Sequence, residues 1–207
     1  MDWSGFYAHQ TGRAVRPTFS AALEAAAEAA DGARFGASGD EKRTAVDLGC
    51  GDGLESRTLL ADGWRVLAID ADPNVVQRVT ADVPEGEQER LTVRQASFAD
   101  VAETPLPDAD LVYAGFALPF CTPEVFEKLW SNIRSALQPG GVFAGQLFGP
   151  HDDFAAWEET NTHGRADVDR LLDGLEVLQL HEEDRDGTSF AGPKHWHVFH
   201  IVARRPR

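Results

Sequence analysis

The sequence contains little cysteine and no long apolar run, and both shortages exclude classes of protein. Its two cysteines, Cys50 and Cys121, lie far apart and have no C-x-x-C partner, so the sequence suggests neither a disulfide framework nor a thiolate zinc site. No stretch approaches the roughly 20 consecutive apolar residues that a membrane-spanning helix needs. The segment 1–10 also lacks the basic and apolar regions of a secretory signal. We therefore expect a cytoplasmic protein without a membrane partner.

Basic residues are scarce relative to acidic ones. Lysine and arginine together number 19 against 34 aspartate and glutamate residues, which gives a formal net charge of −15. Because nucleic-acid affinity depends largely on clustered cations that neutralise phosphates, this balance disfavours a nucleic-acid partner. At 207 residues, of which 43% are hydrophobic, the chain is long enough for one domain with a substantial core. A monomer and a homodimer are both reasonable for such a chain.

Strand-like apolar segments alternate with helix-like segments from residue 44 onward. We expect strands at 44–48, 65–70, 91–95, 110–115, 141–148, 175–181 and 196–203, and helices at 54–62, 73–83, 123–137, 153–159 and 165–172. Such alternation implies parallel strands joined by crossover connections. The Ala-rich segment 21–30 predicts a further helix, which the Gly-rich patch 32–40 ends. The whole chain, 1–207, is therefore expected to be one domain, with an N-terminal helical segment, 1–40, ahead of an α/β core, 44–207.

The end of the sequence departs from this alternation. The last expected strand, 196–203, follows the strand at 175–181 without a helical segment between them. A hairpin is therefore implied, and it makes the final strand antiparallel. The predicted fold class is α/β, with a doubly wound sheet that is mostly parallel, a C-terminal antiparallel hairpin strand, and helices on both faces.

A glycine-rich turn follows the first core strand, with the sequence D-L-G-C-G-D-G at 47–53. Glycines there allow positive φ and the close approach of a ligand, and the N-terminus of the next helix offers unpaired N–H groups. Asp70 ends the next strand, where its carboxylate can accept hydrogen bonds from both hydroxyls of a ribose. The loop and the acid together predict a site for a ligand that contains a nucleoside.

Two classes of cofactor use such a loop, and residue 54 favours one of them. A dinucleotide-binding fingerprint read from Gly49 needs a small residue at position 54, where this chain has Leu54. The loop instead resembles motif I of class I S-adenosylmethionine-dependent methyltransferases, an acid and an apolar residue followed by G-x-G-x-G. The resemblance extends over 44–206, because Asp70 matches the ribose-binding acid and the closing hairpin matches the antiparallel seventh strand. Within this class, the chain is similar to tellurite-resistance and general methyltransferase domains of bacteria.

The resemblance implies a Rossmann-like fold and S-adenosylmethionine as the cofactor. After the third strand the family often has an acid and an apolar residue beside the adenine, whereas this chain has Ser97 and Phe98, with Asp100 as an alternative acid. The N-terminal segment is expected to fold over the cofactor as a lid, and Arg13 to pair with the methionine carboxylate. Packing of this segment against the sheet edge is the alternative. The expected cofactor-binding residues are Asp47, Gly49, Cys50, Gly51, Gly53, Asp70, Ala71, Ser97, Phe98, Tyr7 and Arg13.

Histidines at strand ends are the candidates for a general base. The site of an open α/β sheet lies outside the carboxyl ends of its parallel strands, which selects the segment 113–120, His151 after the fifth strand and His195 at the hairpin. Each histidine could instead be packed in a loop, and a base is needed only for an acceptor that must lose a proton. His195 and His197 share one strand face, but the sequence reveals no third ligand, and we expect no metal site.

The expected activity is methyl transfer to a small-molecule substrate by in-line displacement. The resemblance implies that the protein mainly supplies alignment and desolvation, with the substrate positioned by the lid and the loops after the strands. The alternative is a non-catalytic module that binds or senses S-adenosylmethionine, because a fold does not fix a function.

Overall fold

The computed structural model describes residues 12–33, 42–189 and 192–207. Its helices and strands follow the alternation that the sequence predicts. In chain order they are α2 (Pro17–Ala33), β1 (Thr44–Leu48), α3 (Leu54–Ala61), β2 (Arg65–Asp70), α4 (Val75–Thr80), α5 (Glu85–Gln88), β3 (Leu91–Gln95), α6 (Phe98–Glu103), β4 (Ala109–Ala114), η1 (Leu118–Phe120), α7 (Pro123–Ala136), β5 (Leu137–Phe148), η2 (Asp153–Ala156), α8 (Arg165–Leu171), β6 (Glu176–Ser189) and β7 (Gly192–Arg204).

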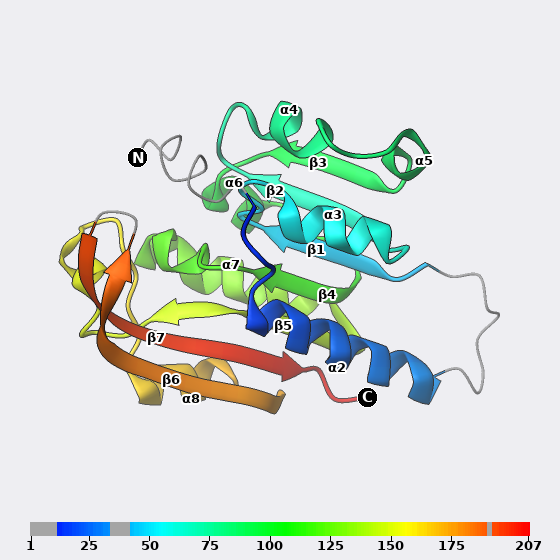
Figure 1. Cartoon of the computed structure of the whole chain (residues 1–207). Coiled ribbons are helices and arrows are strands. Elements are labelled where there is room, and N and C mark those ends of the chain that lie inside the picture. The colour runs from blue at the N-terminus through cyan, green and yellow to red at the C-terminus, as the bar shows by residue number, and fades with distance from the viewer. Residues whose placement is uncertain (1–11, 34–41, 190–191) are drawn as a thin grey trace.

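The strands form one seven-stranded sheet in the order β3-β2-β1-β4-β5-β7-β6. The pairs β1–β2, β2–β3, β1–β4 and β4–β5 are parallel, whereas β7 pairs antiparallel with both β5 and β6. The chain runs outward from β1 to β3 and then returns to place β4 on the other side of β1 (Figure 1). The predicted fold, a mostly parallel doubly wound sheet with a C-terminal antiparallel strand, is confirmed. Its topological switch point lies between β1 and β4, where open α/β sheets bind their ligands.

Two apolar clusters sandwich the sheet, one on each face. The first joins α2, α3 and α4 to the strands through residues such as Phe19, Leu59 and Val79. The second joins α6, α7 and α8 to the opposite face, with Trp130 and Phe143 packed edge to face. Because successive strand residues point to opposite faces, β1 contributes Ala45 to the first cluster and Val46 and Leu48 to the second. The result is a three-layered sandwich with helices on both faces, as the sequence predicts (Figure 1).

Three local expectations need correction. No helix was predicted after β3, but α6 forms there, and Ser97 caps it reciprocally with Asp100. The segment 153–159 was expected to be helical, whereas only the short 3₁₀ turn η2 forms. The hairpin strands extend well beyond 175–181 and 196–203. The extension was not predicted because the extra part of β6 is polar and exposed and carries no alternation of apolar residues.

The extension of the hairpin matters for the site. Only the second half of β7, from Val198 to Arg204, pairs with β5. The first half of β7 therefore projects beyond the carboxyl end of the parallel strands, together with the part of β6 that pairs with it, 184–189. The helix α2, part of the segment expected to act as a lid, packs against the sheet with Phe19, Ala22 and Ala26 buried. Of the helices in the described part of the chain, none is long and apolar enough to cross a membrane.

Replacement of Phe143 tests the sandwich. The ring is 0% exposed and packs at 4.8 Å, centroid to centroid, from Trp130. Phe143→Ala should lower the free energy of unfolding by about 3–5 kcal/mol, because the cavity it leaves cannot fully collapse. The control, Val177→Ala, removes a 46% exposed side chain from β6 and should cost less than about 0.5 kcal/mol. Urea denaturation measures both, and equal losses would contradict this description of the core.

Candidate functional site

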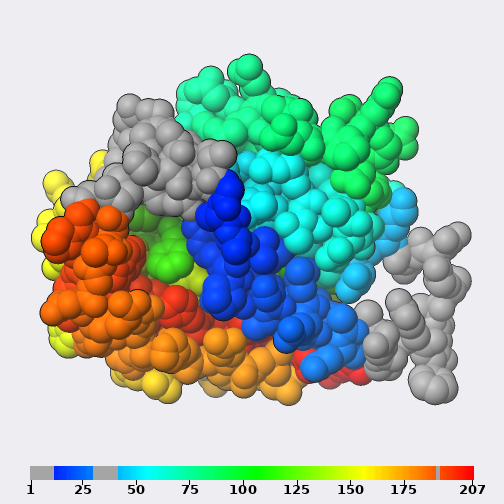
Figure 2. Space-filling model, in the orientation of Figure 1, coloured from blue at the N-terminus to red at the C-terminus, as the bar shows by residue number. Residues whose placement is uncertain are grey.

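A cavity of about 870 Å³ opens at the switch point of the sheet. The loops after β1, β2 and β4 form its floor, while the segment 12–16 ahead of α2 and the projecting end of the β6–β7 hairpin form two of its walls. Figure 2 shows a hollow between the blue chain that leads into α2 and the orange end of the hairpin. The cavity lies where the sequence analysis placed the site.

The glycine loop takes a conformation that glycine favours. Gly49, Gly51 and Gly53 have φ angles of 69°, 55° and 74°, in the left-handed region that L-residues rarely adopt. The amides of Gly49 and Cys50 both donate to the carbonyl of Ile69, at 2.8 and 3.0 Å, which holds the loop against the end of β2. A Cβ on Gly49 would stand 2.3 Å from the Cβ of Ala117, so the loop after β4 packs directly on this glycine.

Asp70 connects the glycine loop to the turn after β2. Its Oδ2 accepts a hydrogen bond from the Gly51 amide at 2.9 Å, and its Oδ1 accepts one from the Asp72 amide at 2.9 Å. The residue is 9% exposed and lines the cavity, so the carboxylate is fixed at the cavity wall. A carboxylate has about four lone-pair positions and can accept several hydrogen bonds at once.

One end of the cavity is acidic. Arg13 binds Glu55 through two hydrogen bonds of 2.6 and 2.5 Å and reaches Asp52 at 3.2 Å, while Arg16 meets Glu55 at 3.1 Å. Burial raises the pKa of the Glu55 carboxyl, but the hydrogen bond and charge of Arg13, with the charge of Arg16, outweigh it and hold that pKa below its usual value. The carboxyl groups that line the cavity are those of Asp47, Asp52, Glu55, Asp70 and Asp72.

Asp47 is the most deeply buried of these acids. It is 1% exposed, and the Ser56 hydroxyl donates to its Oδ2 at 2.6 Å. Burial, with a contribution from the charge of Glu55, raises the pKa of Asp47 to about 7. The acid of the glycine motif is therefore close to half-protonated at neutral pH, which links the stability of this loop to pH.

Two buried donors in the same region have no partner among the described residues. They are the hydroxyl of Tyr113, at the end of β4, and the Nε of Arg13. Both residues line the cavity. A buried polar group without a partner costs free energy, so an unpaired pair of donors beside a cavity indicates that a ligand satisfies them. Sequence analysis named Arg13, and Tyr113 only as part of the segment 113–120.

The residues expected beside an adenine also line the cavity. Ser97 and Phe98 stand at the start of α6, and Ala71 follows Asp70. The Ser97 hydroxyl donates to the Asp100 carboxylate at 2.7 Å and accepts from the Asp100 amide at 3.2 Å. The helix cap therefore uses this hydroxyl both as a donor and as an acceptor. Asp100 itself is not part of the lining. The contribution of this wall is therefore mainly apolar, through Phe98 and Ala71.

The opposite end of the cavity is aromatic. Phe116 has a φ of 55°, which is rare for a residue with a bulky side chain, and its amide donates to Gln146 at 3.0 Å. Gln146 is 1% exposed and also binds Thr18 of α2 at 2.9 Å, so it ties α2 to this strained turn. Sequence analysis did not identify Gln146, although a polar residue within a buried strand is a signal for such a role. The aromatic residues at this end are Phe116, Phe120, Phe148, Phe154 and Trp196.

The structure does not bring the expected bases to this cavity. His195 and His151 are absent from its lining and lie in a separate cluster on the outer side of the hairpin, where each pairs with Asp184. Of the remaining expectations, Tyr7 lies outside the described residues. Cys50, in the glycine loop, lines the cavity and is buried. Burial raises the pKa of the Cys121 thiol to about 12, so Cys121 packs in the core as a neutral thiol.

Comparison with protein families identifies the central part of the chain. Residues 46–145, just under half of the chain, match the family described as Methyltransferase domain. Carboxy-S-adenosyl-L-methionine synthase of Erwinia tasmaniensis is 27% identical over 157 residues, which cover 68% of this chain and 62% of that protein. An uncharacterized methyltransferase of Synechocystis is 29% identical over 158 residues, which cover 66% of this chain and 68% of that protein.

Solved structures share the fold. TehB from Haemophilus influenzae has a TM-score of 0.66 at 18% identity, with 86% of this chain and 62% of that one covered. The 1,6-didemethyltoxoflavin-N1-methyltransferase of Burkholderia thailandensis, solved with its substrate and S-adenosylhomocysteine, has a TM-score of 0.63 at 16% identity, covering 99% and 85%. The Rossmann-like fold that the resemblance implies is therefore confirmed, and the central part of the chain matches a methyltransferase domain.

Substitution of Gly49 tests the close contact in the loop. Gly49→Ala forces a Cβ to within 2.3 Å of Ala117 at a φ of +69°, whereas Gly63, with a φ of +86°, has nothing within 4 Å of such a Cβ. Gly63→Ala is the matched control and should cost about 1–2 kcal/mol of unfolding free energy, the penalty of the left-handed region alone. Gly49→Ala should cost clearly more. Chemical denaturation compares the two, and equal losses would show that the contact with Ala117 carries no weight.

Replacement of Asp47 tests its raised pKa. A carboxyl with a pKa of about 7 in the folded chain and 3.8 as its model value binds more protons when folded, so its contribution to stability falls as pH rises between these values. Asp47→Asn removes this pH-dependent loss. The unfolding free energy of the variant, relative to that of the unmodified chain, should therefore rise by about 2–3 kcal/mol from pH 5 to pH 8, at about 1.4 kcal/mol per pKa unit. Urea denaturation at both pH values measures it. A constant difference would refute the buried-acid description.

Proposed function

We propose that this chain, whose central part matches a methyltransferase domain, binds S-adenosylmethionine in the cavity and transfers its methyl group to a small molecule. The observation that carries the proposal is the Asp70 carboxylate, fixed by the amides of Gly51 and Asp72 at the wall of the cavity. A carboxylate beside a glycine loop at the switch point of the sheet can accept hydrogen bonds from ribose hydroxyls, which supports the proposal. The bound S-adenosylhomocysteine of the Burkholderia methyltransferase, which shares the fold, supports the same choice of cofactor.

The charge of the cavity fits a sulfonium and opposes a diphosphate. Five carboxyl groups line it against two guanidinium groups, those of Arg13 and Arg16, and both of these already bind Glu55. Opposite charges attract and like charges repel most strongly where water is excluded. A positively charged sulfonium is therefore favoured, while the pyrophosphate of a nicotinamide cofactor would face an excess of negative charge. This agrees with the argument from Leu54.

The chain offers a partner for each part of the cofactor. Asp70 accepts from the ribose, and the apolar wall of Ala71 and Phe98 packs against the adenine. The unpartnered Tyr113 hydroxyl and Arg13 Nε donate to the carboxylate of the methionine part, which satisfies both buried groups. This keeps Arg13 in its expected role, although two of its other N–H groups are used by Glu55.

The aromatic end holds the acceptor. S-adenosylmethionine, when bound, supplies an electrophilic methyl group on its sulfur. Phe116, Phe148 and Trp196 line the far end of the cavity with apolar ring surface, with ring centroids 6.2 to 6.4 Å apart. Such rings favour a small, flat acceptor and exclude water from the path of the methyl group. The chain thus contributes mainly alignment and desolvation.

The function is tested by following the label of methyl-labelled S-adenosylmethionine. The purified chain is incubated with the labelled cofactor and a metabolite extract, and products are identified by mass spectrometry. A labelled small molecule together with S-adenosylhomocysteine supports the proposal. Conversion of the cofactor to carboxy-S-adenosylmethionine would assign instead the reaction in the name of the Erwinia relative, and binding without any conversion would favour the sensor alternative.

Replacement of Asp70 tests the ribose contact. Asp70→Ala should weaken binding of S-adenosylhomocysteine by about 1–3 kcal/mol, or roughly 5- to 150-fold, because the ribose hydroxyls and two loop amides lose their acceptor. The control, Asp62→Ala, removes an exposed carboxylate at the end of α3 and should leave the affinity unchanged. Titration calorimetry measures both, with circular dichroism to verify folding. Unchanged affinity in a folded Asp70→Ala chain would refute the contact.

A further inference from the structure

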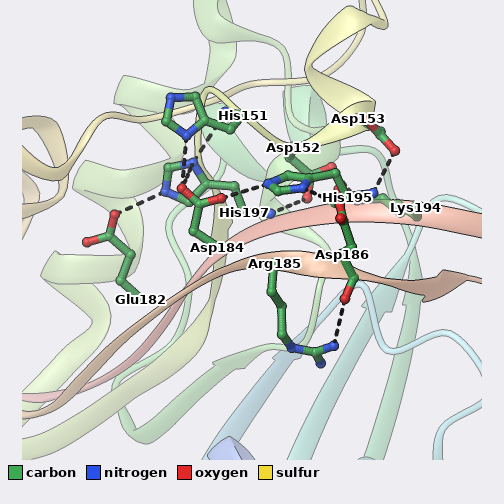
Figure 3. Close-up of polar contacts among 10 residues, drawn as sticks. All are labelled: His151, Asp152, Asp153, Glu182, Asp184, Arg185, Asp186, Lys194, His195 and His197. Atoms are coloured by element: carbon green, nitrogen blue, oxygen red, sulfur yellow. Dashed lines mark hydrogen bonds and ion pairs between the residues drawn. The ribbon is translucent and has the colours of Figure 1, made fainter.

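Histidines and carboxylates meet outside the cavity, on the outer side of the projecting hairpin. His151 comes from the loop after β5, Asp184 from β6, and His195 and His197 from β7. Figure 3 shows these side chains facing one another between the hairpin strands and that loop. The proposed methyl transfer uses none of them. The sequence analysis named His151 and His195 as candidate bases and noted that His195 and His197 share one strand face.

Three of these residues present donor atoms toward one point. His151 Nδ1 lies 2.9 Å from Asp184 Oδ2, and His197 Nδ1 lies 3.9 Å from the same oxygen. One ligand atom from each of the three lies within 4.8 Å of the others. Nitrogen and oxygen ligands stand about 2.0–2.2 Å from Zn²⁺, so two donors on one ion are about 3–4 Å apart. Small rotations of the exposed His151 and Asp184 would bring all three onto a single ion.

A second layer of hydrogen bonds orients the ligands. The other ring nitrogen of His197 lies 3.1 Å from Glu182, which is the carboxylate–histidine arrangement that supports many zinc ligands. The other oxygen of Asp184 lies 2.7 Å from His195, whose second nitrogen is held by Asp186 at 2.8 Å. Each of His197 and Asp184 thus presents one atom to the common point while its other atom is fixed.

The neighbouring backbone and Asp152 fix the position of His197. Its side chain is 5% exposed, and a Cβ on Gly149 would stand 2.3–2.4 Å from three atoms of the imidazole. The residue at 149 must therefore be glycine for the ring to lie where it does. The His197 amide also donates to Asp152 at 3.1 Å, and Lys194 binds the other oxygen of Asp152 at 2.5 Å. These contacts hold a buried imidazole whose Nδ1 accepts a hydrogen bond from the His151 amide at 3.3 Å and lies 3.9 Å from Asp184 Oδ2. A metal ion on this nitrogen would take the place of the hydrogen bond from the amide.

The local charge favours a cation. Glu182, Asp184 and Asp186 place three carboxylates around the histidines. A divalent cation at this position would therefore be attracted by the surrounding carboxylates.

We propose that His151, Asp184 and His197 form a binding site for one divalent transition-metal ion, with Zn²⁺ as the ion that two imidazoles and one carboxylate suit best and water in the fourth position. The ion ties the loop after β5 to the hairpin. Phe148 and Phe154 flank that loop and Trp196 lies on β7, so the site braces the aromatic end of the cavity from outside. The site is independent of methyl transfer, and the proposal departs from the expectation of no metal site.

The test uses the full chain without an affinity tag, freed of metal by a chelator. Zn²⁺ binding is measured by competition with a chromogenic chelator and by elemental analysis after dialysis, without any cofactor. One Zn²⁺ per chain is expected, with tetrahedral Co²⁺ absorption on substitution by Co²⁺. His151→Ala and Asp184→Asn, at exposed positions, should abolish stoichiometric binding, and Glu182→Ala should weaken it about 10- to 100-fold.

The matched control is His181→Ala, which removes another exposed histidine from β6 outside the cluster and should bind Zn²⁺ normally. Circular dichroism verifies that each variant is folded. Absence of stoichiometric Zn²⁺ binding by the unmodified chain would overturn the proposal and leave a set of histidine–carboxylate hydrogen bonds. Equal loss of binding in His181→Ala, or full binding in Asp184→Asn, would overturn it as well.

Discussion

The two hydrogen bonds to the Asp70 carboxylate are the constraint on which the site depends. They join the glycine loop after β1 to the turn after β2, through the amides of Gly51 and Asp72. The Ile69 carbonyl reinforces the join by accepting from Gly49 and Cys50. Because Ala117 packs directly on Gly49, the loop after β4 is fixed by the same arrangement. The loops after β1, β2 and β4 are thus held in one geometry, and together they form the floor of the cavity.

The cavity has two chemically different ends, and the topology of the sheet explains both. The acidic end lies where the chain reverses between β1 and β4, with Asp47, Glu55 and Asp70 around it. The aromatic end lies under the projecting half of the hairpin, which no neighbouring strand of the parallel sheet covers. A cofactor with a cationic centre and an apolar acceptor therefore find complementary surroundings in one space. The strained turn at Phe116, fixed by Gln146, belongs to the aromatic end.

Sequence patterns predicted the parts of this molecule that depend on local periodicity and on glycine. The strands β1 to β5, the switch point, the glycine loop and Asp70 follow from apolar runs and positive-φ requirements that the sequence displays. The helix α6 was missed because its signal is the capping pair Ser97 and Asp100 rather than an apolar stripe. His151 and His195 were placed at the cavity because both follow strand ends. Their true position depends on how far the polar hairpin projects, and only cross-strand pairing determines that.

The central claim is that the Asp70 carboxylate and the glycine loop hold an adenosine that carries a sulfur rather than a pyrophosphate. A crystal structure of the chain with S-adenosylhomocysteine measures this directly. The account predicts the ribose hydroxyls on Asp70, the adenine against Ala71 and Phe98, and the amino acid part beside Tyr113 and Arg13. An adenosine bound elsewhere on the molecule, or a cavity that admits none of the ligand, would contradict it.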